Sequence, residues 1–173
     1  MVTRRVYDSR FAKNTPEMTR MISRPTFARP ALLAALLIAG AASSAFADDS
    51  AAIAAASKEP GAAVSPSGVV YRSLKDGTGA APGATDTVKV NYRGTFVDGK
   101  EFDSSAKNGG PISFPLNRVI PCWTEGVQKM KVGGKAKLTC PSATAYGSRG
   151  AGGTIPPDTT LQFEVELLAI NGK

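Results

Sequence analysis

The stretch RVIPCWTEG, residues 118–126, contains the only tryptophan of the 173-residue chain and one of its two cysteines. Pro121 suits the first position of a helix, because the N–H group that proline lacks would have no partner there. Trp123, Val127 and Met130 follow at the spacing of one helical face. The stretch therefore predicts a short helix with tryptophan near its start. Two interpretations of Trp123 are open: it is the floor of a pocket, or it packs in the core.

Strands are predicted on both sides of this helix, most of them from a period-two alternation of apolar and polar residues. They cover residues 69–75, 88–94, 112–116, 135–140 and 160–170. Asp98-Gly99, between Phe96 and Phe102, has the turn chemistry of a tight hairpin. Because the strands have one apolar and one polar face, an antiparallel sheet is favoured over a parallel one. We expect an α+β fold in which this sheet lays its apolar face on the helix.

The N-terminal residues 1–47 have the features of a secretory signal peptide. Basic residues precede the apolar run ALLAALLIA at 31–39, and an Ala-x-Ala cleavage pattern ends at Ala47. The run is shorter than the ~20 residues that a membrane span needs, so a transmembrane anchor is the less favoured alternative. Translation starting at Met18 or Met21 would give a signal of ordinary length. We expect export to the periplasm, with full secretion as the alternative.

The charge of the chain changes when this leader is removed. Seven basic and two acidic residues of the leader account for +5 of the formal net charge of +7, so +2 remains. No basic stripe with interleaved aromatics is left, so we expect no nucleic-acid partner. The chain has no histidine, which excludes Ser-His and Cys-His nucleophiles and histidine metal sites. We expect neither a metal nor a cofactor.

The chain has two cysteines, Cys122 and Cys140. An exported protein meets an oxidising compartment, which favours a disulfide between them. The alternative is two separate buried thiols that behave as small apolar side chains.

The stretch after the leader, residues 48–67, consists mainly of Ala, Ser, Gly and Pro. It has almost no large apolar side chain to offset the entropy of ordering. We expect a flexible lead-in with a transient helix over 50–57, followed by a single folded domain over 68–173.

Aromatic side chains beside a few polar groups predict an apolar cavity. Candidate lining residues are Tyr92, Phe102, Asp103, Trp123, Tyr146 and Phe163. Taken singly, Tyr92, Phe102 and Phe163 also suit a purely structural core. Tyr146 differs, because it lies in a glycine-rich loop where a large aromatic has little core to fill.

Four motifs follow one another along the chain: VNYRGTFVDGKEFDSS (90–105), RVIPCWTEGVQKMKVGGKAKLTCP (118–141), AYG (145–147) and TIPPDTTLQFEVELL (154–168). Together they resemble the FKBP-type peptidyl-prolyl isomerases, the immunophilins that bind the macrolide tacrolimus. The resemblance extends over about residues 68–170. It implies an antiparallel half-barrel of five or six strands wrapped around one short helix, with a proline pocket between them.

The resemblance also implies roles for ten residues. The catalytic set is Tyr92, Phe102, Asp103, Ile120, Trp123, Tyr146 and Phe163. The substrate-binding set is Phe114, Val119 and Ile155. Trp123 would be the pocket floor, the N–H of Ile120 and the hydroxyl of Tyr146 would donate to substrate carbonyls, and Ile155 would belong to an overhanging loop.

The chain departs from the family at four positions of the rim. Asn108 and Ile112 stand where an arginine and a phenylalanine are often found, which puts an arginine contact to Asp103 in doubt. Ala151 and Thr154 stand in the overhanging loop where bulkier residues often occur. The resemblance therefore implies a smaller rim and altered inhibitor affinity.

The expected activity is isomerisation of X-Pro peptide bonds in exported proteins. The barrier of ~18–20 kcal/mol comes from amide resonance, and an apolar pocket favours the twisted state in which that resonance is lost. The expected partners are proline-containing polypeptides, with tacrolimus-like macrolides as inhibitors, and the expected state is a monomer without stable membrane insertion. The alternative is a non-catalytic module or chaperone that binds proline-containing peptides.

Overall fold

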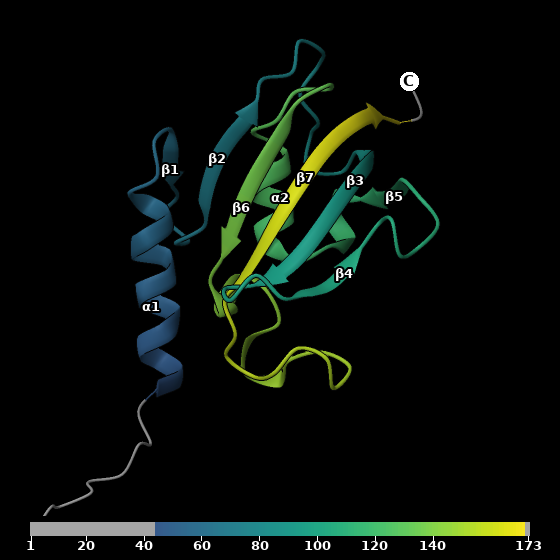
Figure 1. The fold of residues 1–173 in the computed structure, drawn as a ribbon. Helices are drawn as coiled ribbons and strands as arrows, with labels where there is room; N and C mark the ends of the chain where they lie inside the picture. The colour runs from purple at the N-terminus through teal and green to yellow at the C-terminus, as the bar shows by residue number, and fades with distance from the viewer. Residues whose placement is uncertain (1–43, 172–173) are drawn as a thin grey trace, which may run out of the picture. The chain divides into compact units, whose positions relative to one another are not determined.

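The computed structural model describes residues 44–171, which form one antiparallel sheet with two α-helices (Figure 1). The strands are β1 (Ala62–Val64), β2 (Val70–Lys75), β3 (Thr87–Phe96), β4 (Glu101–Ser104), β5 (Ile112–Pro115), β6 (Lys135–Cys140) and β7 (Leu161–Ile170). The helices are α1 (Ser44–Ser57) and α2 (Pro121–Val127). Three 3-10 segments complete the list: η1 (Leu116–Arg118), η2 (Ser142–Thr144) and η3 (Gly147–Arg149).

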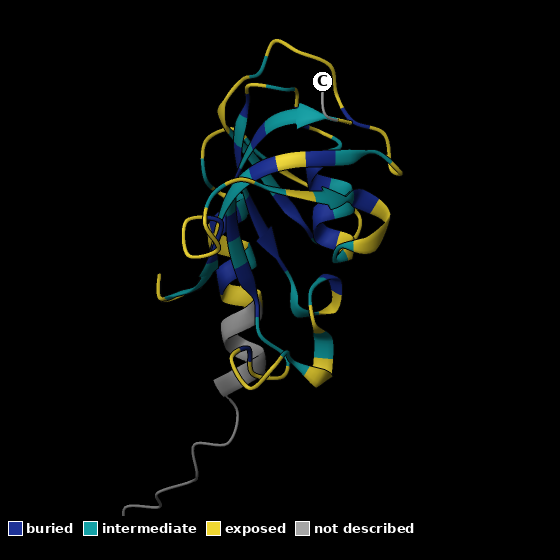
Figure 2. Cartoon of the chain, turned by 90° about the vertical axis from the view of Figure 1, so that its right-hand side faces the viewer, coloured by how far each residue is buried: buried dark blue, intermediate teal, exposed yellow. Residues whose placement is uncertain are grey.

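The strand order is β1-β2-β6-β7-β3-β4, with β5 paired to β3 beside it, and every pairing is antiparallel. Along the strands, buried positions alternate with more exposed ones (Figure 2), as the period-two pattern predicts. The predicted α+β class and antiparallel sheet are confirmed. The sheet has seven strands, more than the five or six expected, and β1 lies in a stretch for which no strand was predicted.

The core lies between this sheet and α2. Trp123, Val127 and Met130 are buried together with inward residues of β3, β6 and β7. Gly126 allows the helix to approach β6 closely, since a Cβ atom there would lie 2.5 Å from a methyl group of Leu138. The predicted one-sided packing is confirmed, but the helix is shorter than predicted, since α2 ends at Val127 and Met130 lies beyond it.

The segment before Gly68 differs from the flexible lead-in that its composition suggested. Ala52 and Ala56 of α1 are buried, and β1 pairs with β2. The carboxylate of Glu59 accepts hydrogen bonds from Arg72 and Lys137 on the sheet. Small alanines can pack closely without large apolar side chains, so composition underestimated the order of this stretch.

Most of the predicted signal peptide, residues 1–43, lies outside the described residues. Residues 44–47 of that prediction fall in the first turn of α1. Within residues 44–171, neither helix combines the length and the apolar character that crossing a bilayer requires.

The predicted disulfide is confirmed. Cys122 and Cys140 are bonded, with their Cα atoms 5.7 Å apart, and both are fully buried. The bond joins the first turn of α2 to the end of β6.

Candidate functional site

A cavity of about 340 Å³ opens between the start of α2 and strands β3, β4 and β5. Its lining residues are Tyr92, Phe102, Asp103, Phe114, Arg118, Val119, Ile120, Trp123, Tyr146 and Phe163. This volume is in the range of small-ligand sites. The structure thus brings together nine of the ten residues singled out from the sequence.

The indole of Trp123 lies at the centre of the aromatic walls. The ring planes of Tyr92, Phe114 and Phe163 stand at 80°, 88° and 90° to it, with centroids 5.3, 5.8 and 5.5 Å away. Such edge-to-face pairs are favourable for aromatic rings. Trp123 is only 5% exposed, yet it lines the cavity. Both interpretations of this residue therefore hold, because it belongs to the core and also forms a surface of the cavity.

Gly94 on β3 makes room for two of these rings. A Cβ atom at this position would lie 2.6 Å from Cζ of Phe102 and 3.0 Å from Cε1 of Phe163. Contacts this short do not occur for real Cβ atoms, so a side chain at position 94 would displace Phe102 or Phe163. The shape of the cavity thus depends on a residue without a side chain.

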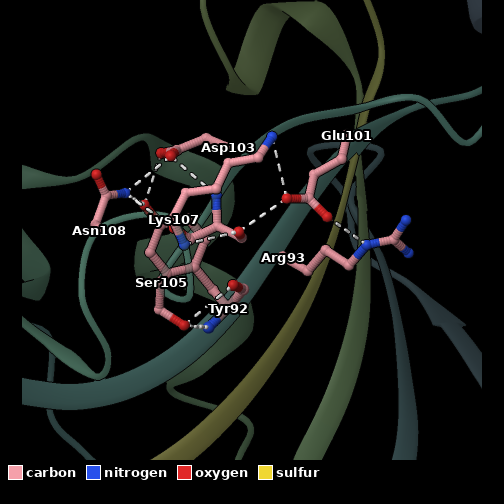
Figure 3. A network of polar contacts seen from close by, with 8 residues as sticks. Tyr92, Arg93, Glu101, Asp103, Ser105, Lys107 and Asn108 are labelled. Carbon is pink, nitrogen blue, oxygen red and sulfur yellow. Dashed lines mark hydrogen bonds and ion pairs between the residues drawn. The ribbon is translucent and has the colours of Figure 1, made fainter.

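A polar network surrounds Asp103 at the edge of the cavity (Figure 3). The hydroxyl of Tyr92 donates to Oδ2 of Asp103 at 2.6 Å. Oδ1 accepts from the backbone N–H of Ser104 and from Nδ2 of Asn108, both at 2.9 Å. Asn108 therefore supplies the contact to Asp103 that was in doubt when no arginine was found at this position.

The environment of Tyr92 keeps its hydroxyl protonated. Burial, and then the hydrogen bond to Asp103, raise the pKa of Tyr92 far above its usual value. The ring and its hydroxyl thus act as one rigid element: the ring packs on Trp123, and the hydroxyl holds Asp103.

Besides the indole N–H of Trp123, whose nitrogen is buried, two hydrogen-bond donors of the cavity have no partner within residues 44–171. The carbonyl of Ile120 accepts from the first turn of α2, but its N–H donates to no described group. The hydroxyl of Tyr146, a residue 39% exposed, has no hydrogen-bond partner there either. Burial, followed by the charge of Asp103, raises the pKa of Tyr146, so this hydroxyl stays a donor at neutral pH. Both donors are available to a ligand.

Ile155 packs in the core and is not part of the cavity lining. It is 7% exposed and belongs to the core cluster. Its N–H and carbonyl both pair with the backbone of Ala151 at 2.9 Å. These two hydrogen bonds close the loop of residues 151–155, which contains Thr154.

Arg118 is the lining residue that sequence reasoning missed. It ends the 3-10 segment η1, two residues before Ile120. The sequence did contain one indication that Arg118 lines the cavity. It directly precedes Val119 and Ile120 in the motif that forms the site.

A separate cavity of about 280 Å³ lies around Tyr71, Lys75, Lys129 and Lys131. It shares no lining residue with the aromatic cavity and has no aromatic floor. The aromatic cavity is therefore the better candidate site.

The chain is similar in sequence to proteins of one known family. The sequence model of the family described as FKBP-type peptidyl-prolyl cis-trans isomerase matches residues 79–168. The FKBP-type peptidyl-prolyl cis-trans isomerases FkpA of Aeromonas hydrophila and Escherichia coli K12 are 56% identical over 117 residues and 53% identical over 114. These alignments cover 68% and 66% of this chain, but 43% and 42% of the relatives. The chain thus spans about two fifths of the length of these curated relatives.

Solved structures show the same similarity. The crystal structure of FkpA from Escherichia coli matches with a TM-score of 0.70 and 49% identity, covering 72% of this chain and 58% of that one. A peptidyl-prolyl cis-trans isomerase from Pseudomonas syringae pv. tomato matches with a TM-score of 0.70 and 38% identity. That match covers 76% of this chain and 96% of the Pseudomonas chain.

Proposed function

Because the chain belongs to the FKBP-type peptidyl-prolyl cis-trans isomerases, we propose that it catalyses the cis–trans isomerisation of peptide bonds that precede proline. The observation that carries the proposal is the aromatic cavity with unpartnered donors in its lining, among them the Ile120 N–H and the Tyr146 hydroxyl. The substrates are proline-containing polypeptides, and tacrolimus-like macrolides are competitive inhibitors.

The cavity suits a reaction that needs no nucleophile. Rotation about the X-Pro bond costs ~18–20 kcal/mol because the planar amide is stabilised by resonance. As the bond twists, conjugation and charge separation decrease, so an apolar cavity favours the twisted amide more than water does. Trp123 holds the prolyl ring in this environment.

The two free donors orient the substrate. Hydrogen bonds from Ile120 N–H and Tyr146 Oη fix carbonyl groups on the substrate and so restrict the chain to conformations near the twisted state. Asp103 keeps Tyr92 in place by accepting a hydrogen bond from its hydroxyl group. This role of Asp103 involves no proton transfer.

The place of action follows from the N-terminal sequence. We propose that residues 1–47 direct export, that the enzyme works in the periplasm on newly exported proteins, and that residues 68–173 form the isomerase domain. The disulfide between Cys122 and Cys140 is consistent with an oxidising compartment.

The proposal is tested with the purified protein and a peptide containing one X-Pro bond. The expected result is accelerated cis–trans exchange, inhibited by tacrolimus and greatly reduced in Trp123→Leu, with far-UV circular dichroism checking that the variant folds. A protein that binds tacrolimus but leaves the exchange at the buffer rate is the non-catalytic binding module. A protein that does neither has no functional pocket.

A further inference from the structure

Arg118 brings a positive charge to the rim of the aromatic cavity. It is the only basic residue among the lining residues described above, and its side chain is exposed. Within residues 44–171 its guanidinium makes no hydrogen bond and no ion pair. Of the thirteen Lys and Arg residues in this region, six are paired with carboxylates, and Arg118 is the one of the other seven that lines the aromatic cavity. The six paired residues are Arg72, Arg93, Lys107, Lys129, Lys135 and Lys137.

The backbone that carries Arg118 is firmly anchored. Leu116, at the other end of η1, is completely buried, and its carbonyl accepts a 2.6 Å hydrogen bond from Oγ1 of Thr124 on α2. Two residues after Arg118, Ile120 begins the hydrogen bonding of α2 through its carbonyl. The free guanidinium is therefore attached to a rigid segment beside the unpartnered N–H of Ile120.

The acidic residue of the cavity does not neutralise this cation. Both oxygens of Asp103 are occupied by protein donors, namely the Tyr92 hydroxyl on Oδ2 and the Asn108 amide and Ser104 N–H on Oδ1. No ion pair joins Asp103 to a basic residue among the described residues. The cavity thus offers an entering substrate the Ile120 N–H, the Tyr146 hydroxyl and one available cation.

We propose that Arg118 makes the site favour a carboxylate over the neutral amide of the same size on a residue next to the substrate proline. This inference rests on the proposed isomerase function and names a substrate class for it. A guanidinium can hold a carboxylate through two parallel hydrogen bonds. Cavity walls of low polarity also weaken the screening of such a contact compared with open water.

The test uses capped peptides in which the only charge is the side chain under study. One pair has Glu or Gln immediately before proline, and a second pair has Glu or Gln immediately after it. Cis–trans exchange is measured by NMR magnetisation transfer with the full-length protein, and the Glu/Gln ratio of kcat/KM is taken within each variant. Both rates in a ratio are measured with the same protein preparation. A change in the overall activity or in the folded fraction of a variant therefore alters both rates equally and leaves the ratio unchanged.

The expected Glu/Gln ratio is about two- to fivefold in at least one pair, the size of one exposed ion pair. It should fall to about one in Arg118→Gln and below one in Arg118→Glu. It should also decrease at high salt, because added ions screen an exposed contact. Arg149→Gln is the matched control: Arg149 is exposed and unpaired but does not line the cavity, so the ratio should stay at the wild-type value.

Two outcomes overturn the proposal: a ratio near one in both wild-type pairs, or a raised ratio that persists in Arg118→Gln. Failure of the isomerase function itself looks different, because the Gln peptides would then exchange at the buffer rate with every variant.

Discussion

The hydroxyl of Tyr92 on β3 donates a hydrogen bond to the carboxylate of Asp103 on β4, with 2.6 Å between Oη and Oδ2. The same Tyr92 ring stands edge-on to the indole of Trp123. One side chain thus links the polar rim of the cavity to its aromatic floor. The two tyrosines of the site differ in this respect, since the hydroxyl of Tyr146 has no hydrogen-bond partner within residues 44–171.

Replacing Tyr92 with phenylalanine should destabilise the fold. The change removes the donor to Oδ2 of Asp103, and a hydrogen bond to a carboxylate in a partly buried site contributes about 1–3 kcal/mol. Urea unfolding at pH 7 measures the difference in free energy of unfolding. Tyr71→Phe on β2, outside the aromatic cavity, should leave kcat/KM unchanged, whereas Tyr92→Phe should lower it. An unchanged unfolding free energy for Tyr92→Phe would mean that the bond contributes nothing.

Tyr146→Phe should show the opposite pattern. Its hydroxyl makes no bond in the described structure, so the free energy of unfolding should change by less than about 0.5 kcal/mol. A hydrogen bond made to the substrate contributes about 0.5–1.5 kcal/mol, which lowers kcat/KM by roughly two- to tenfold. Peptide exchange rates and urea unfolding of the same preparation test both parts. Wild-type kinetics in this variant would exclude the hydroxyl from the reaction.

Gly94→Ala should damage the cavity without touching a polar group. The new methyl would overlap Cζ of Phe102 and crowd Cε1 of Phe163, and overpacking of this kind costs about 1–3 kcal/mol. Tacrolimus affinity, measured by calorimetry, should decrease because both rings line the cavity. Gly83→Ala is a suitable control, since a Cβ there would meet its nearest atom at an ordinary 3.5 Å. Equal tacrolimus affinities for the two variants would contradict this account of Gly94.

The disulfide should contribute substantially to stability. Cys122 and Cys140 are 18 residues apart in sequence, and closing a loop of this length stabilises the fold by about 3 kcal/mol in the chain-entropy treatment. Urea unfolding with and without reductant should show this difference for the wild type. The double variant Cys122→Ala/Cys140→Ala should be less stable and insensitive to reductant. A wild type that is equally stable under both conditions would refute the prediction, provided that thiol titration shows complete reduction.

The sequence predicted the strands and α2 well because their residues follow clear periodicities. Leu161, Phe163, Val165 and Leu167 alternate strictly, and all four are buried in β7. The aromatic side chains of the site could be selected because their motifs lie on such regular elements. Their common cavity then follows from the curvature of one sheet around one helix.

The features that the sequence did not predict depend on how residues far apart in the sequence meet in the fold. Some arise from a contact between such residues, and others arise because a side chain finds no partner. Glu59 bonds to Lys137, 78 positions away, and this contact helps to order a stretch whose composition suggested flexibility. Ile155 packs in the core cluster although it lies in a loop, where no regular side-chain pattern reveals it. The availability of Arg118 is a property of its surroundings, so it could be recognised only in three dimensions.

Glu101, next to Phe102 and Asp103 in sequence, should make stability depend on pH. Its carboxylate is held by Arg93, Ser104 and Lys107 (Figure 3), and these bonds, that to Arg93 first, lower the pKa of Glu101 from 4.5 to about 2. As the pH falls, the unfolded chain therefore binds a proton at this residue before the folded protein does.

The stabilising contribution of Glu101 is consequently complete above about pH 4.5 and is lost as the pH falls toward 2. Glu101→Gln lacks this contribution at every pH, so it should be less stable than the wild type at pH 7, with a difference that shrinks between pH 4.5 and 2.5. Urea unfolding of both proteins at a series of pH values measures that difference. If the difference in free energy of unfolding stays constant down to pH 2.5, the contacts of ionised Glu101 with Arg93 and Lys107 do not stabilise the fold. In that case β4, which carries Phe102 and Asp103 into the cavity wall, would be held by its backbone pairing with β3 and by the hydrogen bonds of Asp103 with Tyr92 and Asn108.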